Sequence, residues 1–160
     1  GGHSRTGGEC AMTIAAIIAG RGTVHTASPG ESLSDVARRL TDLRIGAVPV
    51  VDGDEVVGIL SERDILHCVA RLGADAMATS VAEAMTAPVI TIEPGAAVLS
   101  ALSLMTHRRI RHLPVLEGGS LAGFDGGRLV AFVSIGDLVK YRIERIEAEA
   151  AAMRDYISGA

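Results

Sequence analysis

The sequence predicts an α/β fold, of the α+β kind, built from two β-α-β-β-α repeats and a C-terminal helix. The first observation is a duplication, since residues 23–51 align with residues 88–116 at a constant offset of 65, with nine of the 29 positions identical. The second is that the same order of strand-like and helix-like patterns occurs in each copy. The third is that one copy alone cannot bury both faces of its sheet, whereas two copies packed together can. We therefore expect the two repeats to form one body.

Each copy begins with a short strand, residues 23–27 in the first and 89–93 in the second, which a Pro-Gly pair ends. An amphipathic helix follows, with apolar residues at the 3.6-residue spacing of a helix face. These apolar positions are Leu33, Val36, Ala37 and Leu40 in the first copy, and Val98, Ala101, Leu102 and Met105 in the second.

Two further strands complete each sheet, residues 47–51 and 56–60 in the first copy. Asp52-Gly53 between them is a strong hairpin signal. In the second copy the strands are 112–116 and 129–133, and the stretch between them is Gly-rich and eight residues longer. Two similar segments there, "GSLAGF" and "GRLVAF", leave the register of the returning strand open. Short helices, residues 13–20 and 81–85, precede the two copies.

The composition indicates a packed globular chain and argues against several classes of function. Of the 160 residues, 48% are hydrophobic and 21% charged. A net charge of -4, with no Trp, two Phe and two Tyr, argues against a nucleic-acid-binding protein. No apolar run approaches the roughly 18 residues of a membrane span. Cys10 and Cys68 form no paired framework, which favours a reducing compartment, the cytoplasm. Residues 1–11 are expected to be a leader that is disordered or of artificial origin.

A Ser-x-x-Asp motif recurs where the last strand of each copy leads into a helix, as Ser61 with Asp64 and as Ser134 with Asp137. A helix N-terminus favours a phosphate, and a carboxylate can accept hydrogen bonds from both hydroxyls of a ribose. Gly136 would let the backbone approach a ligand closely. The same spacing is also that of a capping box, which would only stabilise the helix start. The motif alone leaves both interpretations open.

These motifs together resemble the cystathionine-β-synthase (CBS) domain family in its paired form. The resemblance rests on "IGAVPVV", "GILSERD", "EAMT", "RIRHLPV" and "SIGDLVK" and covers about residues 12–141. It implies a pseudo-two-fold pair whose clefts bind AMP, ADP, ATP, NADH-type dinucleotides or S-adenosylmethionine, and which acts as a sensor that regulates a partner protein. The expected boundaries are a leader at 1–11, repeat one at 12–74, repeat two at 75–141 and a helical tail at 142–160.

By the family's pattern, the cleft at Asp137 is the first candidate for AMP. Arg111 would face the ligand phosphate, and small residues at 46 and 47 would leave space for the base. The residues implied for this cleft are Ser134, Gly136, Asp137 and Arg111, with Thr26, Ile45, Gly46, Ala47 and Val48 at the adenine edge.

The cleft at Asp64 would take a dinucleotide, a polyphosphate or nothing, because bulkier side chains surround the base position. Arg63 could serve a second phosphate. The residues implied for it are Ser61, Arg63 and Asp64, with Thr91, Ile110 and His112. One departure from the family's pattern is Ala131, which stands where repeat one has Gly58.

No enzyme signature is present, so we expect no catalytic residue, no metal and no catalytic cofactor. The sequence lacks a P-loop, a dinucleotide-binding Gly motif and a nucleophile elbow, and its five His residues show no ligand spacing. The alternatives are a structural or oligomerisation module with empty clefts, an S-adenosylmethionine sensor, and an enzyme such as a nucleotidase. Binding of an adenine nucleotide, without nucleic acid or membrane, is the main prediction.

The C-terminal tail carries a heptad-like apolar pattern. Its apolar positions, spaced 4, 3, 4, 3 and 4, are Val139, Ile143, Ile146, Ala150, Met153 and Ile157. This spacing is typical of coiled-coil contact, and Arg145 can pair with Glu149 one turn later. A terminal helix folded onto its own domain would need the same stripe. We favour dimerisation and expect a homodimer.

Overall fold

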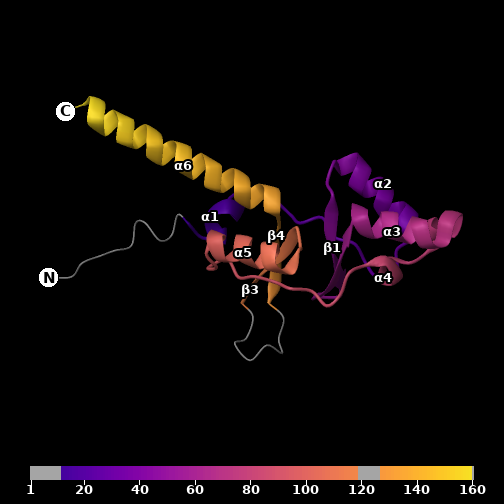
Figure 1. Cartoon of the computed structure of the whole chain (residues 1–160). Coiled ribbons are helices and arrows are strands. Elements are labelled where there is room, and N and C mark those ends of the chain that lie inside the picture. Colours follow the sequence, from indigo (N-terminus) through magenta and orange to yellow (C-terminus); the bar gives the residue numbers. More distant parts are fainter. Residues whose placement is uncertain (1–11, 119–126, 160) are drawn as a thin grey trace. The chain divides into compact units, whose positions relative to one another are not determined.

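The computed structural model describes residues 12–118 and 127–159. It confirms a mixed α/β fold with short two-stranded sheets and a long C-terminal helix (Figure 1). The expected leader, residues 1–11, and most of the Gly-rich stretch at 117–128 lie outside the described residues. The elements in chain order are α1 (Ile14–Ile18), α2 (Leu33–Leu43), β1 (Ala47–Asp52), β2 (Glu55–Ser61), α3 (Glu62–Leu72), η2 (Gly73–Ala78), α4 (Val81–Ala84), α5 (Val98–Arg108), β3 (His112–Glu117), β4 (Arg128–Ser134) and α6 (Ile135–Ser158).

The described residues form two compact units, which we name after the motif carboxylate that each contains. The Asp64 unit takes residues 22–91, 114–118 and 127–132. The Asp137 unit takes residues 12–21, 92–113 and 133–159.

The core of the Asp64 unit lies between the β1–β2 hairpin and its helices. β1 and β2 pair antiparallel, with a bulge between Val50 and Val51. The pairing of Asp52 with Glu55 leaves a two-residue loop, Gly53-Asp54, one residue later than the sequence predicted. The buried cluster contains Ala27, Leu33, Val36, Leu40, Val48, Val50, Leu60, Cys68, Ala76 and Val81. Three of the four apolar positions predicted on α2 belong to it, so the helical spacing located the core face correctly.

The short strands predicted at the start of each repeat are single β-bridges instead. Ala27 bridges Val50 in parallel, donating to the Pro49 carbonyl at 3.0 Å and accepting from the Val51 N–H at 2.8 Å. The next bond of a parallel ladder would need an N–H at residue 49, which proline lacks. The ladder therefore stops after one residue. In repeat two Pro114 stands at the position of Pro49, and Ile92 is likewise a lone bridge residue.

The short helix that precedes each repeat is bound by the other repeat. Ile14 and Ala15 of α1 donate backbone hydrogen bonds to Ala96 and Pro94, at 2.9 and 2.8 Å. In the same way, the first two residues of α4 donate to Glu31 and Pro29, at 2.9 and 3.0 Å. The acceptors of the two sets are equivalent in the duplication, 65 residues apart, whereas the donors are 67 residues apart. The first two free N–H groups of each helix are thus satisfied at the Pro-Gly turn of the opposite repeat.

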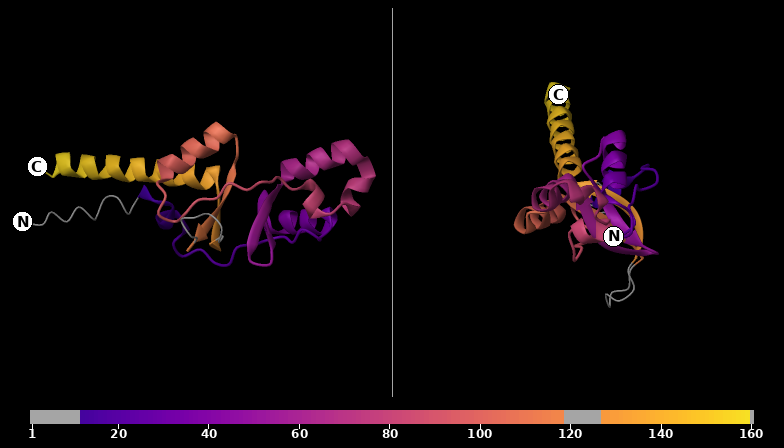
Figure 2. Two further views of the ribbon diagram at one scale, coloured as in Figure 1. Left: turned by 90° about the horizontal axis from the view of Figure 1, so that it is seen from below. Right: turned by 90° about the vertical axis from the view of Figure 1, so that its right-hand side faces the viewer.

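The Asp137 unit is built from α1, α5 and α6. Its fully or nearly fully buried residues are Ile14, Val98, Ala101, Met105, Leu113, Val133 and Leu138. The last helix of repeat two and the C-terminal tail form one uninterrupted helix, α6, of 24 residues. α1 and α5 lie beside the first turns of α6, whereas its yellow C-terminal half extends beyond both of them (Figure 2). β4 begins at Arg128, which identifies the second of the two similar Gly-rich segments as the returning strand.

Gly58 in β2 marks a close approach to the end of α4. A Cβ at this position would overlap the thioether of Met85 and lie 3.1 Å from the Thr86 carbonyl oxygen. We predict that Gly58→Ala lowers the free energy of unfolding by about 1–3 kcal/mol, because the added methyl displaces packed atoms. Urea unfolding followed by circular dichroism measures this change.

Gly30→Ala is the matched control, because an added Cβ there meets nothing within 4 Å. We expect it to change stability by less than about 0.5 kcal/mol. Because Met85 provides the main obstacle, Gly58→Ala combined with Met85→Ala should cost less than the sum of the single changes. Strictly additive costs would contradict this account of Gly58.

Candidate functional site

Both Ser-x-x-Asp motifs form complete capping boxes at the strand-to-helix junctions. In the Asp64 unit the Ser61 N–H donates to Asp64 Oδ2 at 2.9 Å, and the Asp64 N–H donates to Ser61 Oγ at 3.3 Å. In the Asp137 unit the corresponding distances, between Ser134 and Asp137, are 2.8 and 3.1 Å. The capping interpretation is therefore correct for both motifs. The Ser N–H of each capping box donates to Oδ2 of the Asp, and Oδ1 of the same carboxylate has a different partner.

The second carboxylate oxygen of each Asp is held by a residue that the sequence analysis did not select. Thr86 Oγ1 donates to Asp64 Oδ1 at 2.8 Å. Arg21 forms an ion pair with Asp137, with 3.4 Å between Nη2 and Oδ1. Arg21 and Thr86 occupy equivalent positions, 65 residues apart. Each follows the short helix, α1 or α4, that is bound by the opposite repeat. Extending the repeat alignment two residues toward the N-terminus would have drawn attention to them. The two sites therefore differ, because one carboxylate faces a cation and the other a hydroxyl.

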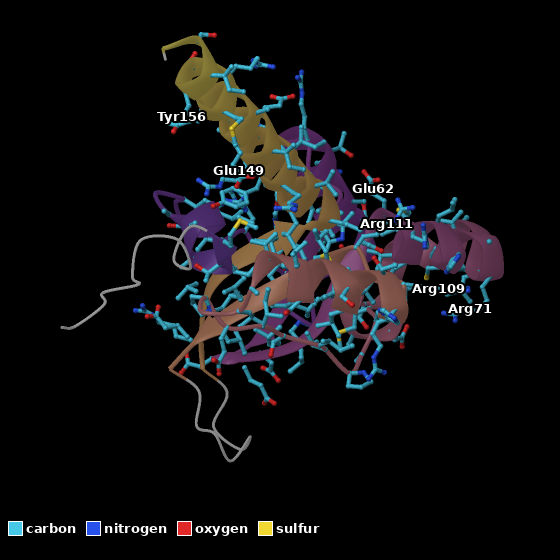
Figure 3. The ribbon with its side chains drawn as sticks, turned by 60° about the vertical axis from the view of Figure 1, so that its left-hand side comes forward. Glu62, Arg71, Arg109, Arg111, Glu149 and Tyr156 are labelled. Carbon is cyan, nitrogen blue, oxygen red and sulfur yellow. The ribbon has the colours of Figure 1, made fainter. Side chains whose placement is uncertain are left out.

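The residues that precede β1 and β3 meet the helix that follows in the same unit. The Glu62 N–H donates to the Gly46 carbonyl at 2.9 Å, and the Ile135 N–H donates to the Arg111 carbonyl at 2.8 Å. Figure 3 labels Glu62 and Arg111 at these positions. Gly46 and Arg111 are equivalent in the duplication, so a site without a side chain in one repeat carries a guanidinium in the other.

Thr26, a predicted adenine-edge residue, accepts a hydrogen bond from Arg39 of α2, which also forms an ion pair with Glu31. Arg39 Nη1 donates to the Thr26 carbonyl at 2.9 Å, and the same guanidinium pairs with both carboxylate oxygens of Glu31. Glu31 also accepts from the Ser28 N–H at 2.8 Å. Repeat two has Ala96 and Leu104 at the positions of Glu31 and Arg39. The equivalent ion pair therefore cannot form beside the Pro-Gly turn of repeat two.

The predicted site residues divide between the two units. The Asp64 unit contains Thr26, Ile45, Gly46, Ala47, Val48, Ser61, Arg63, Asp64 and Thr91. The Asp137 unit contains Ile110, Arg111, His112, Ser134, Gly136 and Asp137. Within the first set, β1 pairs Ala47 with Ser61, and Val48 is part of the buried core. Within the second set, Ser134, Gly136 and Asp137 share the first turn of α6 with the Arg111 carbonyl. The combinations of residues across the units remain predictions.

In the part of the chain that the structure describes, no group of three or more His, Cys, Asp or Glu side chains could hold a metal ion. Among the helices of residues 12–118 and 127–159, none combines the length and apolar character needed to cross a bilayer.

A protein-family model described as the CBS domain matches residues 21–71 and 81–144. The chain is 33% identical to the mitochondrial CBS domain-containing protein CBSX3 of Arabidopsis thaliana, over 81% of this chain and 61% of that protein. It is 30% identical to the CBS domain-containing protein YhcV of Bacillus subtilis, over 80% of this chain and 85% of that protein. It is also 36% identical, over 72% of its length, to 20% of an inosine-5'-monophosphate dehydrogenase of Mycobacterium tuberculosis. The chain thus spans less than two thirds of CBSX3 and a fifth of the dehydrogenase.

Solved structures show the same fold. A protein with CBS domains from Burkholderia ambifaria is 38% identical, with a TM-score of 0.73, over 82% of this chain and 94% of that one. The CBS domain pair of protein MJ0100, in complex with 5'-methylthioadenosine and S-adenosyl-L-methionine, is 23% identical with a TM-score of 0.69, over 83% and 97% of the two chains. CBSX2 in complex with AMP is 21% identical with a TM-score of 0.66, over 82% and 96%. At these last two identities the likeness is one of fold.

The Glu31–Arg39 pair predicts a pH-dependent contribution to stability. The hydrogen bond from Arg39 lowers the pKa of Glu31 from the usual 4.5 and outweighs burial, which raises that pKa. Since the folded-state pKa is the lower one, the contribution is complete above the unfolded-state value and is lost as the pH falls through the folded-state value. We therefore predict that Glu31→Gln lowers stability at pH about 7, by up to about 1 kcal/mol, and that this difference shrinks toward pH about 3.

Urea unfolding of both proteins across this pH range measures the difference. Asp42→Asn, at an exposed position near the end of α2, serves as a control for the removal of an acidic side chain. A difference between wild type and Glu31→Gln that stays constant down to pH about 3 would contradict the assignment of the pair.

Proposed function

This chain belongs to the CBS domain family, and from that premise we propose that it is a regulatory module that binds an adenine nucleotide, AMP in the first instance, and controls a partner protein without catalysing a reaction. The observation that carries this proposal is the pair of carboxylates at the two strand-to-helix junctions. Each combines a helix N-terminus with a carboxylate that keeps one oxygen outside the main capping bond. A ribose diol and a phosphate are ligands that suit such a junction.

The Asp137 junction is the better candidate for a nucleotide phosphate because the guanidinium of Arg21 pairs with its carboxylate and a second arginine, Arg111, bonds to the helix start through its backbone. Arg21 lies 3.4 Å from the Asp137 carboxylate, and Arg111 contributes the carbonyl that accepts from the first turn of α6. Guanidinium groups bind phosphate through directed, charge-assisted hydrogen bonds. At the Asp64 junction the corresponding positions are Thr86 and Gly46, neither of which carries charge. We therefore propose AMP at Asp137, and a dinucleotide, a polyphosphate or no ligand at Asp64.

The adenosyl class of ligand is supported by proteins of the same fold. CBSX2 was crystallised with AMP, and the MJ0100 pair with 5'-methylthioadenosine and S-adenosyl-L-methionine. These ligands share the adenosyl group and differ at its 5' carbon, which carries a phosphate in AMP, a sulfonium in S-adenosyl-L-methionine and an uncharged thioether in 5'-methylthioadenosine. The cationic Arg21 and Arg111 favour the phosphate, so an S-adenosylmethionine sensor is the second proposal. ATP and NADH carry the same adenosine and phosphate groups and belong in the same titration.

A partner protein is proposed because the same module occurs inside larger chains. The match to a fifth of an inosine-5'-monophosphate dehydrogenase is one case. Binding can shift such a module only by the difference between the ligand's affinities for its two arrangements. We further propose a cytoplasmic location, for which the free and buried thiol of Cys68 is the supporting observation.

Asp137→Asn tests the proposed ribose contact. The Asn side chain retains an oxygen that can accept from the Ser134 N–H, so the helix cap persists while one acceptor and the charge are lost. We predict that AMP binds the wild type and that Asp137→Asn weakens this binding at least about tenfold, or 1.4 kcal/mol. Calorimetric titration with AMP, ATP, NADH and S-adenosylmethionine measures the affinities.

Asp64→Asn is the matched control, since it changes the equivalent carboxylate of repeat one. It should leave the strongest AMP site within about twofold of wild type, and thermal unfolding should show both variants folded. If none of the four ligands gives heat, the motifs serve as helix caps alone. The chain is then a structural module, which the complete capping boxes equally suit.

Arg111→Gln tests the proposed phosphate contact. We predict that it weakens AMP binding about tenfold and changes adenosine binding by less than about twofold, because only AMP carries the phosphate. Arg108→Gln, an exposed basic position on the last turn of α5, controls for the loss of general positive charge. Equal weakening of AMP and adenosine by Arg111→Gln would contradict the assignment.

A further inference from the structure

One face of α6 carries six apolar side chains, which we call the α6 seam. The α6 seam consists of Val139, Ile143, Ile146, Ala150, Met153 and Ile157. Near the start of the helix Val139 is 42% exposed, and near its end Met153 and Ile157 are 60% and 67% exposed. A continuous apolar strip of this kind on a surface helix indicates a contact with another protein surface.

The packing of α6 in its own unit uses a different side of the helix. Leu138 is the buried residue of α6, and it lies outside the seam. α1 and α5 contact α6 but leave Ile143 and Ile146 about half exposed. A terminal helix folded onto its own domain would bury these residues. The intramolecular alternative for the heptad pattern therefore does not account for the seam.

We propose that the α6 seam packs against the same seam of a second copy of this chain, with the two helices parallel and in register. This inference does not depend on ligand binding. The 4-3 spacing places Ile143, Ala150 and Ile157 at the a positions of a heptad and the other three seam residues at the d positions. From the first to the last seam residue, the contact would run along about 27 Å of helix.

The charges beside the seam favour the parallel arrangement. In a parallel pair, each g residue lies near the e residue five positions later in the partner helix. Arg142 would then face Glu147 of the second copy, and Glu149 would face Arg154 of the second copy. Both contacts are attractive, and symmetry makes each occur twice. Glu149, on the C-terminal half of α6 (Figure 3), also lies 3.9 Å from Arg145 of its own helix.

The antiparallel arrangement that pairs all six seam residues is disfavoured by the same charges. It would pair Ile146 with Ala150 and bring e residues beside e residues and g residues beside g residues. Glu147 would then face Glu147 of the second copy, and Glu149 would face Glu149 of the second copy. Lys140 would face Arg154 of the second copy. Like charges at these positions repel. The charges beside the seam thus favour a second copy of this chain in the parallel orientation.

Sedimentation equilibrium of the full chain tests the contact. We expect the wild type to be a dimer and Ile146→Lys to raise the dimer dissociation constant at least about tenfold, because a charge enters the seam. Ala148→Lys introduces the same charge at an exposed position outside the seam and should leave the dimer unchanged. Circular dichroism verifies that the variants are folded. A monomeric wild type, or a dimer that Ile146→Lys does not weaken, would overturn the proposal.

Disulfide trapping tests the orientation. In a Cys10→Ser background, Ile157→Cys places a thiol at the last a position, where parallel helices in register bring the two copies together. Mild oxidation should therefore give a cross-linked dimer. Asp155→Cys, outside the seam on the same turn, should cross-link far less. Equal cross-linking of the two variants, or none in Ile157→Cys while the dimer persists, would overturn the parallel arrangement.

Discussion

The structure depends on a reciprocal exchange of backbone hydrogen bonds. The N-terminal amides of α1 are satisfied by carbonyls of the second repeat's Pro-Gly turn, and those of α4 by the turn of the first. A helix end left without such partners in a packed interior would cost free energy. Because Ile14 and Val81 are both fully buried, each exchanged helix also contributes to a core. Neither repeat is complete with its own sequence alone, which explains why the chain carries two. The same exchange delivers Arg21 and Thr86 to the carboxylates of the capping motifs.

Much of the fold was predictable because each hydrophobic pattern occurs in both repeats, so that one copy supports the interpretation of the other. The faces of α2 and α5 followed from helical spacing, and Leu33 and Val98, at equivalent positions, are both fully buried. The first strand of each repeat was predicted too long, because β propensity says nothing about the partner's donors. Pro49 lies in the neighbouring strand, more than twenty residues along the chain, and it ends the ladder. Such an effect becomes visible only when the register of the pairing is known.

The candidate site was predictable to the extent that it is local in sequence. Ser61 with Asp64 form a box within one helical turn, so their spacing was sufficient to find them. Arg21 was missed because its contact with Asp137 spans 116 residues and depends on where α1 docks. Single-sequence periodicity contains no information about such docking. The apolar pattern predicted for the tail begins at Val139, inside repeat two, and the structure places all of its positions on the single helix α6.

The prolines of β1 and β3 also affect how firmly the neighbouring segments are held. Before Ala27 the chain has no ladder bond to β1, since residue 49 cannot donate one. The carbonyl of Thr26 is instead held by Arg39, whose long side chain can follow a shift of the backbone. Because Pro49 has no amide hydrogen, the backbone before Ala27 can shift without breaking a hydrogen bond to β1. A rigid β-ladder would have resisted the same displacement at every residue.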